Sequence, residues 1–228
     1  MLFVFLACSG PTPLDTAPAE IPRGALSLAF PLASSAPIDQ LVGVDHDPTV
    51  QQGIDQLICT NYAEQGFPWC YDEHHGSDYM LDGGFTAMDA GSLEILAAAD
   101  GVVVDIEDGH YDRCHGDLDG VNCDGEPMVS NKVVIEHQSP DGPHRTLYFH
   151  MMKDSVSVAI GQQVRCGDVL GKVGSSGNSS APHLHFELQG PQDQVIDPYA
   201  GPASQPETWW TEQGALEGYP SSQCADSD

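Results

Sequence analysis

The sequence predicts an all-β protein, a single antiparallel β-sheet domain with glycine turns, long loops and few short helices. Short runs of β-branched and aromatic residues recur along the chain, and glycines and prolines separate them. The 228 residues include 24 Gly and 17 Pro, and no stretch has the apolar spacing of a long amphipathic helix. Apolar residues make up 40% of the chain, which is enough to form a core.

The N-terminal residues 1–25 differ from the rest in composition. An apolar run ends just before Cys8, and residues 9–24 are rich in Pro, Thr and Ala. This order resembles a bacterial lipoprotein signal with its lipidation cysteine, followed by a flexible tether. It predicts an exported protein, either a periplasmic or outer-membrane-anchored lipoprotein or a secreted one, that touches a membrane only through a lipid on Cys8. Because no Lys or Arg precedes the run, a start upstream of Met1 and an apolar N-terminus without signal function stay open.

A folded body is expected over residues 26–200. Residues 36–72 mix short apolar pieces with Pro, Gly and Asp and give no clear assignment. The segment 102–107, rich in valine and preceded by Gly101, is typical of a strand after a turn.

A β-hairpin is predicted from residues 132–137 and 145–150, because both are strand-like and an Asp-Gly pair lies between them. Side chains alternate between the two faces of a strand. We therefore expect Tyr148 and His150 on one face of this hairpin and Phe149 on the other.

The last predicted strand, residues 183–188, carries His183 and His185 on the same face, since they are two positions apart. Glycine-punctuated turns precede it between residues 161 and 177. Residues 201–228, which include Trp209 and Trp210, lack strand or helix signals and are expected to form a loose tail.

The charge balance restricts the partners. Seven Lys and Arg against 34 Asp and Glu give a formal net charge of −27 with His neutral. Such a surface repels phosphates and anionic headgroups, which excludes nucleic acid. The excess fits a solubility or salt adaptation, with cation binding as the alternative. For the acidic insertion 108–126, a solvated loop closed by a disulfide is favoured over a Ca²⁺ site. The carboxylates of the insertion do not follow the EF-hand order. The carboxylates are Asp112, Asp117, Asp119, Asp124 and Glu126.

Seven cysteines indicate an oxidising compartment, with Cys8 as the odd one. The remaining six allow 15 connectivities. Short loops favour Cys59–Cys70 and Cys114–Cys123, which leaves Cys166–Cys224. Since no two cysteines form a CxxC pair, a cysteine-ligated zinc site is not expected.

Metal-binding side chains occur in three short motifs, namely His74-His-Gly-Ser-Asp78, Tyr148-Phe-His150 and His183-Leu-His185. A catalytic zinc needs three N or O ligands and one open position, so these residue types suit it. Each motif alone is weak, because paired histidines are often ordinary surface residues. His75 is an alternative to His74, although the spacing to Asp78 favours His74.

Taken in order, the motifs resemble the lysostaphin-type zinc metalloendopeptidases of peptidoglycan. The resemblance covers about residues 26–200, and its most specific block runs from residue 174 to residue 187. The segments that carry it are His74-His-Gly-Ser-Asp78, Ala97-Ala-Ala-Asp-Gly101, Tyr148-Phe-His150, Gly174-Ser-Ser-Gly177 and Ala181-Pro-His-Leu-His-Phe-Glu187.

The resemblance implies one Zn²⁺ per chain with His74, Asp78 and His185 as ligands, and His150 and His183 as catalytic histidines. It also implies hydrolysis of the stem peptides that cross-link peptidoglycan. Two alternatives stay open: a non-catalytic wall-binding or regulatory module that activates another hydrolase, and a zinc peptidase acting on secreted proteins. The sequence specifies neither the bond cleaved nor the oligomeric state.

Overall fold

A computed structural model describes residues 26–35, 37–50, 57–91, 93–117, 120–214 and 218–225. The predictions for the signal, Cys8 and the tether, and the position of Asp119, lie outside these residues. Within the described ranges, no helix has both the length and the apolar character needed to cross a membrane.

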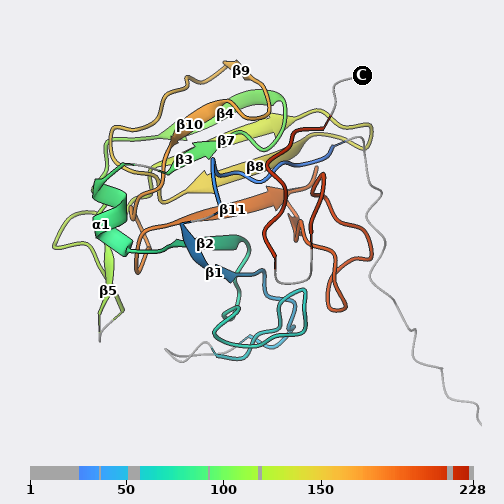
Figure 1. Cartoon of the computed structure of the whole chain (residues 1–228), viewed down its shortest axis with the longest axis horizontal. Coiled ribbons are helices and arrows are strands. Elements are labelled where there is room, and N and C mark those ends of the chain that lie inside the picture. Colours follow the sequence, from blue (N-terminus) through green and yellow to red (C-terminus); the bar gives the residue numbers. More distant parts are fainter. Residues whose placement is uncertain are drawn as a thin grey trace, which may run out of the picture.

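The fold is built on one antiparallel sheet, as predicted (Figure 1). Strand β11 lies inside the sheet, between β2 and β8, and β1 and β9 lie at the two ends of the order. The strands in spatial order are β1 (Ile38–Val42), β2 (Ser77–Leu81), β11 (His183–Gln189), β8 (His144–Phe149), β7 (Lys132–His137), β4 (Gly101–Glu107) and β9 (Gln163–Val164), and β12 (Val195–Ile196) also pairs with β11.

Smaller elements surround this sheet. Strands β3 (Glu94–Leu96) and β10 (Val169–Lys172) pair with each other, and β5 (His115–Asp117) and β6 (Gly120–Asn122) form a hairpin in the acidic insertion. The helix α1 (Gly84–Asp89) follows β2, has Gly83 as its N-cap and contains six residues. Figure 1 places α1 and β5 at the same side of the molecule.

The core lies on one face of the main sheet and includes Trp209 and Trp210 from the C-terminal segment. Phe186 of β11 packs against Tyr148 with ring centroids 5.3 Å apart, and against Trp210 at 5.6 Å. Trp209 and Trp210 are both buried. The expectation of a loose tail is therefore wrong for its described part, because these two indoles fill the core and hold the backbone there.

Most predicted strands are confirmed, since β4, the β7–β8 hairpin and β11 lie where they were expected. Strand β1 was not predicted. The three predicted disulfides are also present, and they are Cys59–Cys70, Cys114–Cys123 and Cys166–Cys224. These bonds agree with the export expected from the cysteine count.

The prediction that Tyr148 and His150 share a face is wrong at the end of β8. Tyr148 is fully buried on the core face, where its hydroxyl accepts a hydrogen bond from the Ala98 amide at 2.9 Å. Phe149 is the register partner of His185 and lies on the opposite face. β8 ends before His150, whose φ of 61° is left-handed. This turn, rather than strand alternation, directs His150 toward His185.

Candidate metal centre

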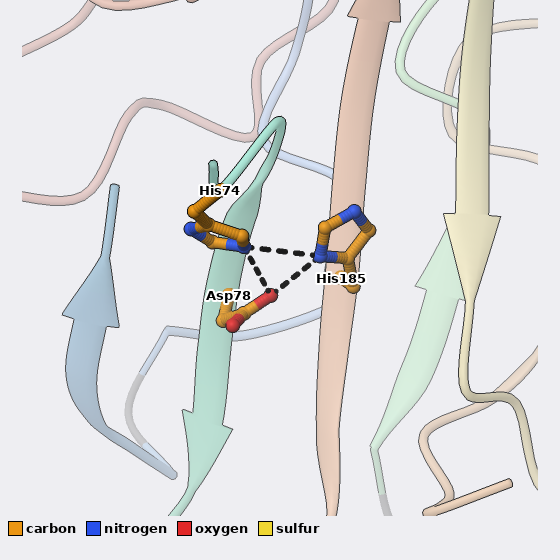
Figure 2. Close-up of side chains that lie close together, drawn as sticks. All are labelled: His74, Asp78 and His185. Atoms are coloured by element: carbon orange, nitrogen blue, oxygen red, sulfur yellow. Dashed lines mark hydrogen bonds and ion pairs between the residues drawn. The ribbon is translucent and has the colours of Figure 1, made fainter. Parts of the chain in front are cut away.

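Three predicted side chains converge on one point on the face of the sheet opposite the core (Figure 2). Asp78 on β2 is the register partner of His185 on β11, and His74 lies in the loop just before β2. The Asp78 Oδ1 atom is 2.7 Å from His185 Nδ1 and 3.2 Å from His74 Nε2. The two imidazole nitrogens are also 3.2 Å apart. The sheet register therefore brings together residues that are 107 positions apart in the sequence.

The backbone fixes the orientation of His74. Its Nδ1 lies 2.7 Å from the Gly43 carbonyl oxygen, which can only accept, so Nδ1 carries the proton. The Nε2 lone pair of a neutral ring then faces Asp78. Tyr71 stacks on the imidazole with centroids 4.2 Å apart. His75 is exposed, so the structure brings His74 and not His75 to the cluster.

A carboxylate fixes the orientation of His185. Its Nε2 lies 2.9 Å from Glu187 Oε1. Glu187 Oε2 in turn accepts a hydrogen bond from the side-chain amide of Gln189 at 2.9 Å. A proton on Nε2 leaves the Nδ1 lone pair facing Asp78. Gly76 makes room for the ring, because a Cβ at that position would lie 2.7 Å from His185 Cε1.

The electrostatics of the cluster favour positive charge. Burial opposes charge on Asp78, but the neighbouring histidines, His74 first among them, hold its pKa well below the usual value. Burial also opposes charge on His185, yet the hydrogen bond that its Nδ1 donates to Asp78, the negative charge of Asp78 and the contact with Glu187 raise the pKa of His185 to about 9. Two carboxylates thus stabilise a cation at the His185 Nδ1 position, whether a proton or a metal ion.

His150 and His183 lie beside this cluster. Their ring centroids are 4.6 Å apart, and His183 Nε2 is 3.6 Å from Asp78 Oδ1. The Nδ1 of His183 lies 2.7 Å from the Ala181 carbonyl oxygen, and the Nδ1 of His150 lies 2.7 Å from that of Ser176. In both rings Nδ1 is therefore the donor, and Nε2 is free to accept a proton. Burial lowers the pKa of both, most strongly for His150, and keeps them neutral.

The sequence prediction missed three contributors to this arrangement. Strand alternation could have found Glu187, because it is two residues beyond His185 on the same face. The glycine inside the His-x-x-x-Asp motif pointed to Gly76. No sequence signal identified Tyr71, which stacks on His74 and whose hydroxyl pKa is raised by burial first and then by the nearby Asp78 carboxylate.

Residues 74–198 match the family model described as Peptidase family M23. Glycyl-glycine endopeptidase ALE-1 of Staphylococcus capitis is 49% identical over 47 residues, which are 21% of this chain and 12% of that protein. Peptidoglycan DD-endopeptidase ShyA of Vibrio cholerae is 32% identical over 115 residues, or 50% of this chain and 20% of that protein.

A third relative is named as an activator rather than as a peptidase. Murein hydrolase activator EnvC of Escherichia coli is 39% identical over 66 residues, which are 29% of this chain and 14% of that protein. In all three cases the matched segment spans a fifth or less of the relative's length. The family match covers the whole candidate site and supports the resemblance found in the sequence.

Proposed function

Because the chain belongs to peptidase family M23, we propose that it is a zinc-dependent metalloendopeptidase that hydrolyses peptide cross-links of bacterial peptidoglycan. One observation carries this proposal: three potential ligand atoms, His74 Nε2, Asp78 Oδ1 and His185 Nδ1, converge on one point of the sheet.

The donor set fits zinc. Both rings donate their protons away from the cluster, to the Gly43 carbonyl and to Glu187, so the inner atoms of neutral rings are all acceptors. Such atoms repel one another unless a cation lies between them, either a proton on His185 Nδ1 or a metal ion that replaces it. Tetrahedral zinc with bonds of about 2.0–2.1 Å places its ligands about 3.3 Å apart, and two of the observed separations are 3.2 Å. Imidazole with carboxylate is also a ligand set that zinc uses in catalytic sites.

When bound, zinc would polarise the scissile carbonyl and lower the pKa of water. His74, Asp78 and His185 would hold one ion per chain, which leaves a position open for substrate. The carbonyl and carboxylate contacts on the far ring nitrogens would fix the ring orientations.

His150 and His183 would perform the proton transfers. Each ring is neutral and points its Nε2 lone pair away from the backbone carbonyl that holds Nδ1. Such a group can take a proton from water and then pass it to the leaving amine. His183 shares its strand face with His185, and His150 approaches from the end of β8.

The names of ALE-1 and ShyA, which specify different bonds, support the choice of peptidoglycan as substrate. The similarity to EnvC favours a second candidate, a non-catalytic module that activates another hydrolase. The presence of all five predicted site histidines and carboxylates at one place supports catalysis over this alternative.

A digest of purified sacculi tests the proposal. We expect the zinc-loaded protein to release cleaved cross-linked peptides, identified by mass spectrometry, and a chelator to stop the release until zinc is restored. Cleavage only when a second hydrolase is added would support the activator instead. Cleavage of unfolded secreted proteins, with sacculi left intact, would move the substrate away from the wall.

A further inference from the structure

The acidic insertion forms a hairpin that packs on the candidate site. We call residues 110–126 the disulfide hairpin, because Cys114–Cys123 closes it around β5 and β6. Several of its acidic groups already have partners within the protein. Asp112 accepts a hydrogen bond from the Lys153 amide, and Asp124 accepts one from the Tyr111 hydroxyl. The role of the hairpin is therefore sought in what it contacts.

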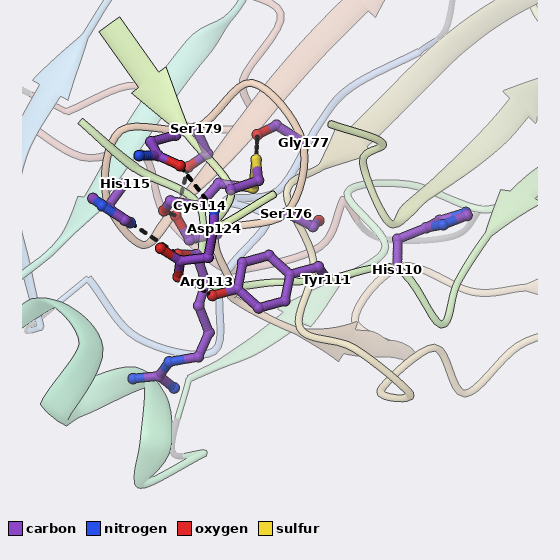
Figure 3. Close-up of a disulfide and its surroundings, with 12 residues drawn as sticks. His110, Tyr111, Arg113, Cys114, His115, Asp124, Ser176, Gly177 and Ser179 are labelled. Atoms are coloured by element: carbon purple, nitrogen blue, oxygen red, sulfur yellow. Dashed lines mark hydrogen bonds between the residues drawn. A yellow bond between two sulfur atoms is a disulfide. The ribbon is translucent and has the colours of Figure 1, made fainter. Parts of the chain in front are cut away.

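The disulfide hairpin pairs with residues 174–180, which we call the serine loop (Figure 3). The Cys114 amide donates to the Ser175 carbonyl at 2.9 Å, and the Ser175 hydroxyl donates back to the Cys114 carbonyl at 2.6 Å. The Gly116 amide donates to the Ser180 carbonyl at 2.7 Å. On the other side of the disulfide, Cys123 Sγ lies 3.5 Å from the Gly177 carbonyl oxygen. The hairpin thus holds the loop near both of its ends, at Ser175 and Ser180, and the disulfide contacts its middle at Gly177.

The serine loop in turn holds the two histidines proposed for proton transfer. The Ser176 carbonyl accepts the His150 Nδ1 proton. The Ser179 hydroxyl lies 3.2 Å from His183 Nδ1 and 2.9 Å from the Ser175 hydroxyl. Ser175, Ser176 and Ser179 are all buried, so water does not substitute for these contacts. A continuous set of hydrogen bonds therefore leads from Cys114 to His183.

We propose that the disulfide hairpin is a positioning element for His150 and His183, acting through Ser175 and the serine loop. This inference rests on the proposed peptidase function. The described polar contacts of His74, Asp78 and His185 are with one another and with residues outside the hairpin, so its loss would disturb proton transfer and leave the metal in place. Displacements of about 1 Å in a catalytic group lower rates by up to 10²-fold.

Two test variants, each with a matched comparison variant, examine this role with the zinc-loaded whole chain on a cross-linked peptide. We expect Cys114→Ser/Cys123→Ser to lower kcat about tenfold or more, while KM and zinc content stay near the parent values. Cys166→Ser/Cys224→Ser removes a disulfide that joins the tail to the Arg165–Gly167 turn, and serves as the matched control with kcat unchanged. Ser175→Ala, which keeps the disulfide, should lower kcat in the same way, and Ser175→Thr, which restores a hydroxyl, should recover it.

A readout without turnover separates this inference from the proposed function. We expect the Nδ1–H proton resonances of His150 and His183 in ¹⁵N-labelled protein to broaden or shift in the Cys114/Cys123 and Ser175→Ala variants, and to stay in place in the control. Failure of the parent to hydrolyse sacculi would end the proposed function without touching this result. Unchanged resonances, or equal losses of kcat in both disulfide variants, would overturn the positioning role.

Discussion

Glu187 holds the outer ring nitrogen of His185: the His185 Nε2 proton points at Glu187 Oε1 across 2.9 Å. The contact sets the tautomer that turns the Nδ1 lone pair of His185 toward Asp78. Because both residues are on β11 and two positions apart, the strand itself maintains the geometry.

The first prediction concerns this contact. Glu187→Ala should weaken zinc binding about 10- to 100-fold, since the loss of such outer partners has this effect in other zinc sites. Glu187→Gln, which keeps an acceptor without the charge, should lie between the variant and the parent. Competition with a chromogenic chelator measures the affinity. Equal affinities for Ala and Glu at this position would remove the orienting role.

The second prediction concerns the ligands. Asp78→Ala and His185→Ala should lose both metal and activity, because each removes one of three proposed ligands. His75→Ala is the matched control, since that ring is exposed next to His74, and it should retain the metal. Elemental analysis of the purified variants decides the matter, and full zinc occupancy in Asp78→Ala would refute the assignment.

The third prediction separates proton transfer from metal binding. His150→Ala and His183→Ala should each lower kcat by about 10²- to 10⁴-fold, the usual contribution of a general acid or base, while zinc remains bound. Paired measurements of kcat and zinc content test it. If His183→Ala loses zinc and His185→Ala keeps it, the two histidines of the motif have exchanged roles.

The fourth prediction uses the close approach at Gly76. In Gly76→Ala the new methyl group would lie 2.7 Å from the His185 ring and 2.8 Å from the Phe186 carbonyl oxygen, so the ring or the strand must move. We expect zinc affinity to fall about tenfold or more, as for other losses of ligand orientation. At Gly66 a Cβ meets its nearest atom at 3.5 Å, so Gly66→Ala should bind zinc like the parent.

The fifth prediction is a pH dependence of stability away from the site. His137 is buried, and burial lowers its pKa, partly opposed by its hydrogen bond to the Asp100 carbonyl. The unfolded chain takes up this proton below about pH 6.5 and the folded protein does not, so the free energy of unfolding falls as pH drops through that value. Urea titrations at pH 5 and 8 should differ less for His137→Asn than for the parent. An equal difference in both proteins would exclude His137 as the group responsible.

The parts of the fold that sequence predicted are those specified by local pattern. The valine-rich β4 and the hairpin around an Asp-Gly turn follow from alternation and turn chemistry. Strand β1 has no such pattern and forms because β2 offers it an edge. His150 adopts a left-handed backbone that a non-glycine residue rarely takes. Its hydrogen bond to the distant Ser176 carbonyl accompanies this conformation, and the local sequence carries no sign of it.

In the candidate site, too, local sequence patterns predicted some features and tertiary contacts determine the others. Motif order identified the residues that meet at the centre, but the contacts that orient them come from tertiary structure. Tyr71 and Gly43 reach His74 from loops that the sequence left unassigned. The burial of Trp209 and Trp210 was missed for a related reason, because their segment lacks periodicity and folds only against the finished sheet.

The pairing of Leu28 with Trp210 also sets the order in which this protein can complete its folding. The Leu28 amide donates a hydrogen bond to the Trp209 carbonyl at 2.8 Å. The Leu28 carbonyl accepts one from the hydroxyl of Thr211, 183 residues later. A nascent chain can therefore contain every site residue while its core still lacks the segment that closes it. A chain truncated before Trp209 should therefore expose Leu28 and Phe186 to solvent and lose stability, although it retains every residue of the candidate site.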